Sequence, residues 1–196
     1  GQSFTANSAL CSGWTSSEVL QSRWGSDYAA NMQRLQSLAA RTGQTVLLYN
    51  GQPAAACYHA ISSGHTEASQ NVWGGQLPYL CGVDSAWDKF ADGYEVTIQY
   101  SAEQVRTALE ELGLTPDDSP ESWVGASTWD KAGYVRTLEL CGQMVSGLEV
   151  RKALDLRSTC FAIAWRGGQF VITTRGYGHG VGLSQYGAKA MAEGGA

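Results

Sequence analysis

The stretch that decides the fold is Cys160-Phe-Ala-Ile-Ala-Trp165, which is followed by Arg166-Gly167-Gly168 and then by Gln169-Phe-Val-Ile-Thr-Thr174. Both arms are rich in β-branched and aromatic residues. Such arms on either side of a glycine pair are typical of two antiparallel strands joined by a tight turn. The sequence therefore predicts a hairpin near the end of the chain, and its neighbours are interpreted around it.

The rest of the chain supplies a second hairpin, further strands and a few short helices. The strand 45–49 runs into Asn50-Gly51, a strong hairpin signal, and the returning strand is predicted over 53–59. Other strands are predicted at 94–100, 123–129, 134–141 and 143–145, and helices at 26–43, after the capping boxes Ser101-x-x-Gln104 and Ser146-x-x-Glu149, and at 183–192. We therefore expect an α+β fold, a single domain rich in antiparallel strands with three or four short helices.

Composition excludes several functional classes. The 196 residues are 43% hydrophobic and only 16% charged, which excludes a disordered tail. The formal charge is −5, and the 13 Lys and Arg are scattered along the chain, so the basic stripe of a nucleic-acid binder is missing. No run of 18 apolar residues is present, and no signal peptide is recognisable at the start. The 24 glycines and 7 tryptophans indicate many turns and aromatic surface.

The five cysteines leave two interpretations open. They contain no C-x-x-C pair, which argues against a zinc ribbon or a thioredoxin-like centre. The spacings from Cys57 to Cys81 and from Cys141 to Cys160 permit two disulfides, which would indicate an oxidising compartment and leave Cys11 over. Buried free thiols are the alternative.

Polar residues able to do chemistry concentrate in two loops. The first is Ser62-Ser-Gly-His65-Thr66-Glu67, and the second is Tyr177-Gly-His179-Gly180 with Ser184-Gln185-Tyr186. All three histidines, His59 included, lie in or beside these loops. Each histidine taken alone is equally compatible with a structural imidazole, so it is their joint placement that indicates a site.

Other arrangements of reactive residues are weaker. The segment 60–64 lacks the first glycine of G-x-S-x-G, and the alternating glycines of 176–182 do not give G-x-G-x-x-G. That alternation instead allows the backbone to lie flush against a ligand or a neighbouring strand. Cys57 and His59 could form a thiolate–imidazole pair, although a structural cysteine is favoured. We expect no cofactor, and a zinc ion bound by Cys57, His59, Cys81 and one of His65 or His179 is the alternative.

Glu67 is the candidate acid. A carboxyl group beside an aromatic wall can stay protonated near neutral pH and donate its proton to a leaving oxygen, and Trp73 follows six residues later. Exposed aromatic rings also suit a groove for sugars. On these residues alone a solvated loop glutamate is favoured, and a two-carboxylate glycosidase would need a partner, for which neither Asp84 nor Asp88 is distinguished.

Three motifs together resemble a known family. Cys57-Tyr-His-Ala-Ile-Ser-Ser-Gly-His-Thr-Glu67 is followed by Asn71-Val-Trp73-Gly and Pro78-Tyr-Leu80; Ser146-Gly-Leu-Glu-Val-Arg151 precedes Leu156-Arg-Ser158; and Gly178-His-Gly-Val-Gly-Leu-Ser-Gln-Tyr-Gly-Ala188 ends the series. These segments resemble the SpoIID/LytB family of bacterial sporulation and cell-wall proteins. The resemblance runs from about residue 49 to 191 and covers most of the chain.

The resemblance implies a lytic transglycosylase that cleaves peptidoglycan glycan strands between N-acetylmuramic acid and N-acetylglucosamine and leaves 1,6-anhydro ends. The family's catalytic glutamate carries over to Glu67, which would act as general acid and then as base. Only one carboxylate is then needed. We expect the substrate to be bound by Ser62, His65, Thr66, Trp73, His179, Gln185 and Tyr186.

The resemblance also implies a location and an alternative function. We expect an extracytoplasmic protein, in the cell envelope or secreted, whose partners are the glycan strand and a cell-wall hydrolase, with no nucleic acid. We expect residues 1–196 to be one SpoIID-like domain truncated at both ends, and a membrane anchor to lie only in a missing N-terminal segment. Some relatives enhance a separate amidase, so a non-catalytic glycan-binding module is the alternative.

Overall fold

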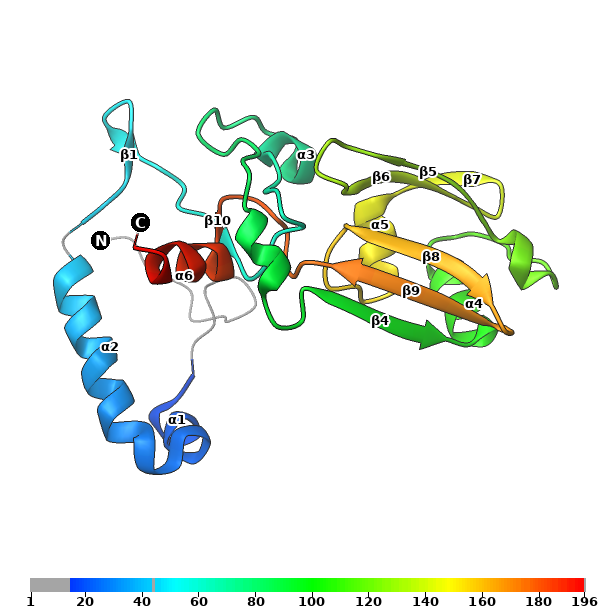
Figure 1. The fold of residues 1–196 in the computed structure, drawn as a ribbon. Helices are drawn as coiled ribbons and strands as arrows, with labels where there is room; N and C mark the ends of the chain where they lie inside the picture. Colours follow the sequence, from blue (N-terminus) through cyan, green and yellow to red (C-terminus); the bar gives the residue numbers. More distant parts are fainter. Residues whose placement is uncertain (1–14, 44, 196) are drawn as a thin grey trace. The chain divides into compact units, whose positions relative to one another are not determined.

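The computed structural model describes residues 15–43 and 45–195, which form two compact units, 1–54 and 55–196 (Figure 1). Within the described residues no helix is both long and apolar enough to cross a membrane. The α+β class rich in antiparallel strands is confirmed.

The first unit contains helices and one small hairpin. Its elements are α1 (Ser17–Trp24), the 3₁₀ turn η1 (Gly25–Asp27), α2 (Tyr28–Thr42), β1 (Leu48–Tyr49) and β2 (Gln52–Pro53). The predicted helix over 26–43 corresponds to η1 and α2, whereas α1, capped by the hydroxyl of Ser16, was not predicted. The Asn50-Gly51 turn is confirmed, and both residues have positive φ, 49° and 75°.

The predicted strand over 53–59 is only partly confirmed. Its first residue belongs to β2, and its end forms β3 (Tyr58–His59) in the second unit, while 54–57 are not in a strand. β3 pairs in parallel with β10 (Leu183–Ser184) instead of returning along β1. The small apolar residues of 54–57 gave no sign that the predicted strand is interrupted there. The strand that pairs with β3 lies more than a hundred residues further along the chain.

The second unit contains two three-stranded antiparallel sheets (Figure 1). One sheet has the order β4-β9-β8 and the other the order β5-β6-β7. Their bounds are β4 (Glu95–Tyr100), β8 (Phe161–Arg166), β9 (Gln169–Arg175), β5 (Val124–Trp129), β6 (Val135–Leu140) and β7 (Gln143–Ser146). The hairpin predicted over 160–174 is confirmed as β8 and β9, with Trp165 opposite Phe170.

Two capped helices close the core of this unit. They are α4 (Ala102–Glu111) and α5 (Gly147–Ala153), and both predicted capping boxes are present, from Ser101 and Ser146. Trp123, which follows the turn η3 (Pro120–Ser122), stacks on Phe170 with 5.7 Å between ring centroids. The buried cluster draws on both sheets and both helices: Val105, Leu109, Trp123, Leu138, Leu140, Val150, Phe170 and Ile172. This core is the rigid support for the loops at one end of the sheets.

The loop region contains three further short helical elements. These are α3 (Ser69–Trp73), η2 (Ala86–Phe90) and α6 (Gln185–Glu193), and α6 confirms the predicted last helix. The β3–β10 pair and isolated bridges from Ile61 to Tyr177 and from Glu67 to Val181 bring the segments 58–67 and 177–184 together. The two polar loops identified in the sequence are therefore neighbours.

The permitted disulfides are not formed: the four cysteines in the described residues are free thiols, of which only Cys160 is buried and Cys81 is exposed. Thr159 accepts a hydrogen bond from Val135 at the start of β6, so Cys160 is near that end, whereas Cys141 follows the other end. The six residues of β6 span about 20 Å, far beyond a disulfide's reach. Cys11 lies outside the described residues.

Candidate active site

Backbone hydrogen bonds hold the two polar loops against each other. Ile61 and Tyr177 exchange two of them, at 3.1 and 2.7 Å, and the amide of Glu67 donates to the carbonyl oxygen of Gly180 at 2.7 Å. A Cβ on Gly180 would lie 2.7 Å from the hydroxyl oxygen of Tyr134 and 3.2 Å from the Cβ of Glu67, and its φ is +78°. Of the two roles open to the alternating glycines, close approach to a neighbouring segment is therefore realised at Gly180.

Glu67 has a buried and fully engaged carboxyl group. Only 5% of its side chain is exposed. Its Oε1 accepts hydrogen bonds from the amide of Ala68 and from Nδ2 of Asn71, both at 2.7 Å, and its Oε2 accepts one from Nη2 of Arg136 at 3.0 Å. The alternative of a solvated loop glutamate is therefore wrong. Asn71 lies on α3 and is exposed, so Oε1 has a partner that solvent reaches.

A second carboxyl group shares the same arginine. Nη2 of Arg136 lies 2.9 Å from Oδ2 of Asp130, while Nη1 donates to the carbonyl oxygen of Asn71 at 3.1 Å. Asp130 is fixed by its other oxygen, Oδ1, which accepts hydrogen bonds from the amides of Ala132 at 2.8 Å and Tyr134 at 3.0 Å. Glu67, Asp130 and Arg136 thus form one cluster, called here the carboxyl cluster.

The pKa of Glu67 is raised above its ordinary value. The main cause is burial, because a desolvated carboxylate is less stable than the neutral acid, and contact with Asp130 acts in the same direction. Hydrogen bonds from Asn71 and Ala68 oppose the rise. The single positive charge of Arg136 lies beside both carboxyl groups. Glu67 therefore retains its proton to higher pH than an exposed glutamate.

Three of the predicted substrate-binding residues have structural partners. Ser62 is fully buried, and both its amide and its hydroxyl donate to Oδ2 of Asp88. Thr66 accepts a hydrogen bond from the amide of Val83 at 2.9 Å. Nδ1 of His65 is hydrogen-bonded to the carbonyl oxygen of Thr66 at 2.7 Å. These contacts hold the loop that carries Glu67 in place.

Trp73 and His179 are brought together. Their ring centroids are 5.0 Å apart, and Trp73 is 51% exposed at the end of α3, the helix that carries Asn71. The ring of His59 lies 5.9 Å from that of His179. Burial lowers the pKa of both histidines, so both are neutral near pH 7.

Gln185 and Tyr186 begin α6 and belong to another surface. Tyr186 lines a hollow of about 200 Å³ with Trp87 and Phe90. Glu67 and the pair Trp73–His179 do not line that hollow. Gln185 is exposed.

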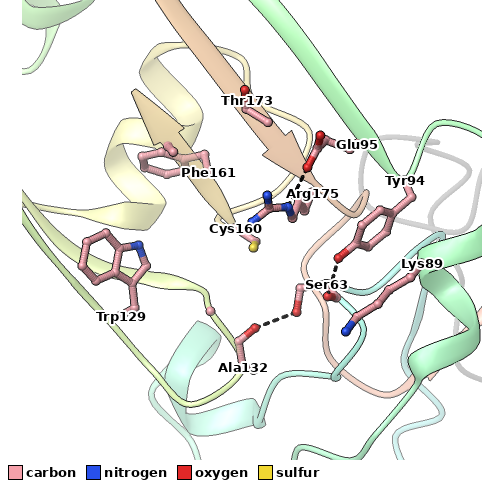
Figure 2. A pocket seen from close by; sticks show the side chains of 12 residues that line it. Ser63, Lys89, Tyr94, Glu95, Trp129, Ala132, Cys160, Phe161, Thr173 and Arg175 are labelled. Carbon is pink, nitrogen blue, oxygen red and sulfur yellow. Dashed lines mark hydrogen bonds and ion pairs between the residues drawn. The ribbon is translucent and has the colours of Figure 1, made fainter. Parts of the chain in front are cut away.

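A larger hollow lies beside the Asp130 turn. It has a volume of about 810 Å³, within the usual range of ligand sites, and Trp129 and Lys89 are among its lining residues (Figure 2). In Figure 2 the hydroxyl of Ser63 donates to the carbonyl oxygen of Ala132 at 2.8 Å, which connects the Glu67 loop to the turn. Trp129 is 57% exposed, so an aromatic face is available there.

Sequence reasoning missed Asp130, Arg136 and the role of Asn71. Asp130 opens a short Asp-Lys-Ala-Gly turn between two strands, a position where aspartate is common for local reasons. Arg136 is an isolated arginine in a strand. No local sequence pattern marked Asp130 or Arg136 as site residues, because each is separated from Glu67 by 60 residues or more of chain. Within 15–43 and 45–195, no group of three or more His, Cys, Asp or Glu could hold a metal ion.

Comparison with known proteins now decides the family. No protein-family model matches the chain. Over 181 residues, 92% of its length, the chain is 37% identical to stage II sporulation protein D of Bacillus amyloliquefaciens and 36% identical to that of Bacillus subtilis (strain 168). This chain belongs to the SpoIID-like family. The resemblance seen in the motifs is thereby confirmed.

The SpoIID-like chain spans about half the length of these curated relatives, 51% in each case. It is also similar to a protein named amidase enhancer from Bacillus subtilis (strain 168), with 26% identity in an alignment that covers 79% of this chain and 29% of the relative.

Proposed function

We propose that this SpoIID-like chain is a peptidoglycan lytic transglycosylase with Glu67 as its acid. The observation that carries the proposal is the buried carboxyl group of Glu67, whose pKa is raised and which is anchored in the junction of the two polar loops. Membership in a family of sporulation proteins supports a cell-wall substrate. A carboxylic acid that stays protonated towards neutral pH is the group that glycosidic cleavage needs.

The proposed reaction needs one carboxyl group and balances without water. Glu67 donates its proton to the oxygen that joins N-acetylmuramic acid to N-acetylglucosamine, and the bond from that oxygen to the anomeric carbon breaks. The 6-hydroxyl of the muramic residue then bonds to the anomeric carbon and gives its proton to Glu67. The products are a 1,6-anhydro end and a free 4-hydroxyl, and Glu67 ends as the acid it was.

The glycan is proposed to approach along α3. Oε1 of Glu67 is hydrogen-bonded to the exposed Asn71, so the glycosidic oxygen reaches the acid by replacing that amide. Trp73, two residues further along α3, presents an exposed ring supported by His179, which offers a flat surface for the apolar face of a sugar. His65, Thr66 and Ser62 contribute by holding the loop, and Gln185 and Tyr186 would contact only a more distant part of the strand.

We also propose that the site works outside the cytoplasm, in the cell envelope or as a secreted protein, because that is where a peptidoglycan strand is found. The name of the amidase enhancer relative supports a cell-wall hydrolase as a partner. The same relative favours a second candidate function, a non-catalytic module that binds glycan and accelerates an amidase.

Digestion of peptide-free glycan strands, with mass analysis of the products, tests the proposal. The wild-type chain is expected to produce 1,6-anhydro-muramic ends, and Glu67→Gln is expected to produce none. Glu121→Gln, a substitution of an exposed surface glutamate, is the matched control and should cleave like wild type. Cleavage by Glu67→Gln at the wild-type rate would remove the acid role. Absence of cleavage by wild type, together with strand binding and acceleration of an amidase, would establish the second candidate instead.

A further inference from the structure

We propose that Asp130 is a positioning residue that shares a single proton with Glu67 and so keeps the acid loaded. This inference rests on the proposed function for its consequence in catalysis, but the shared proton is a property of the carboxyl cluster itself. Asp130 need not touch the substrate, because it acts through Glu67.

The geometry of Asp130 leaves one oxygen in need of a proton. Its Oδ1 already accepts two backbone hydrogen bonds, from Ala132 and Tyr134, which fix the orientation of the carboxyl group. Its Oδ2 is buried and receives no hydrogen bond from the described residues, although Nη2 of Arg136 lies 2.9 Å away. A buried oxygen without a hydrogen bond is rare and energetically unfavourable. A proton placed between the two carboxyl groups would satisfy it.

The charges of the cluster require the same proton. Arg136 supplies one positive charge, and Nη2 lies within 3.0 Å of both carboxyl groups. No other charged side chain in the described part of the chain contacts Glu67, since its remaining partners are the neutral Asn71 and a backbone amide. The nearby hydroxyl of Tyr134 is neutral, because burial raises its pKa to about 12. Two ionised carboxylates would therefore leave a buried net negative charge, and one proton makes the cluster neutral.

This arrangement suits both halves of the proposed reaction. Before cleavage, the shared proton keeps Glu67 available as an acid. After Glu67 has given it to the glycosidic oxygen, two carboxylates face each other beside one arginine. Their repulsion raises the affinity of the cluster for a proton, so the proton of the attacking 6-hydroxyl returns to the same place.

The test is a carboxyl-carbon NMR titration of the whole chain, which needs no activity. Glu and Asp are labelled with ¹³C at their carboxyl carbons, and Glu67→Gln and Asp130→Asn assign the two resonances. In the wild type, the Glu67 resonance is expected to show two titration steps, as a group that shares a proton does. In Asp130→Asn, which keeps the size of the side chain, the Glu67 pKa is expected to fall by about one unit or more, a tenfold change in proton affinity. Asp92→Asn, at an exposed position, is the matched control and should leave the Glu67 curve unchanged.

Two outcomes would overturn the inference. A single-step curve for Glu67 in the wild type would show that no proton is shared, and this measurement holds even if Asp130→Asn fails to fold, because Glu67→Gln alone assigns the Glu67 resonance. A Glu67 curve that does not move in a folded Asp130→Asn variant would do the same. If Glu67 titrates in two steps but the chain cleaves no glycan, the shared proton is supported and the transglycosylase activity is rejected. The two proposals can therefore fail separately.

Discussion

Substitution of Gly180 by alanine should have two effects: it should destabilise the second unit and displace the side chain of Glu67. The added Cβ would lie 2.7 Å from the hydroxyl oxygen and 2.9 Å from the ring of Tyr134, which is 2% exposed and cannot move into solvent. It would also lie 3.2 Å from the Cβ of Glu67. The left-handed backbone, with φ at +78°, costs about 1–2 kcal/mol for alanine, and overpacking of a buried site adds about 1–3 kcal/mol.

Gly168 offers a matched control for this prediction. Its φ is +79°, nearly that of Gly180, but a Cβ there would meet nothing within 4 Å. Gly168→Ala should therefore show the backbone contribution alone, about 1–2 kcal/mol. The difference between the two variants isolates the clash with Tyr134 and Glu67.

Urea unfolding followed by tryptophan fluorescence measures both variants, and glycan digestion measures the effect on the acid. We expect Gly180→Ala to lose about 1–3 kcal/mol more than Gly168→Ala and to be the one that loses cleavage. Equal losses of stability in the two variants would refute the close packing of the two polar loops on which the account of the site depends.

The remaining predictions concern the proton, the aromatic surface and the thiols. Because Glu67 must be protonated to act and its pKa is raised, activity should fall as pH rises through that pKa. In Asp130→Asn this loss of activity should begin about one pH unit lower. A pH profile of kcat/KM that is the same in Asp130→Asn as in the wild type would count against the coupling. Trp73→Ala should weaken binding of glycan strands by about 1–3 kcal/mol without changing the pH profile, measured by titration calorimetry, and Trp87→Ala at the separate hollow is the control. Thiol titration of the denatured chain should find five free thiols, and three or fewer would restore a disulfide.

Elements whose signals are local could be predicted from the sequence. The β8–β9 hairpin and the Asn50-Gly51 turn each depend on residues within about 15 positions, and both capping boxes bond across three residues. Glu67 was found through its motif and not through spacing, because a single glutamate in a loop carries no period.

Features that depend on distant contacts could not be predicted. Parallel pairing of β3 with β10 joins residue 58 to residue 183, and the single returning strand expected over 53–59 was divided as a result. Asp130 and Arg136 reach Glu67 only through the fold. The spacing of Cys141 and Cys160 permitted a bond, but the strand between their positions holds them apart.

The central claim is that Glu67 is the acid of a transglycosylase, and the products formed from peptide-free glycan strands test it most directly. We predict 1,6-anhydro-muramic ends from the wild type, none from Glu67→Gln, and the wild-type amount from Glu121→Gln. Reducing muramic ends formed by hydrolysis, or 1,6-anhydro ends that Glu67→Gln still produces, would contradict the account.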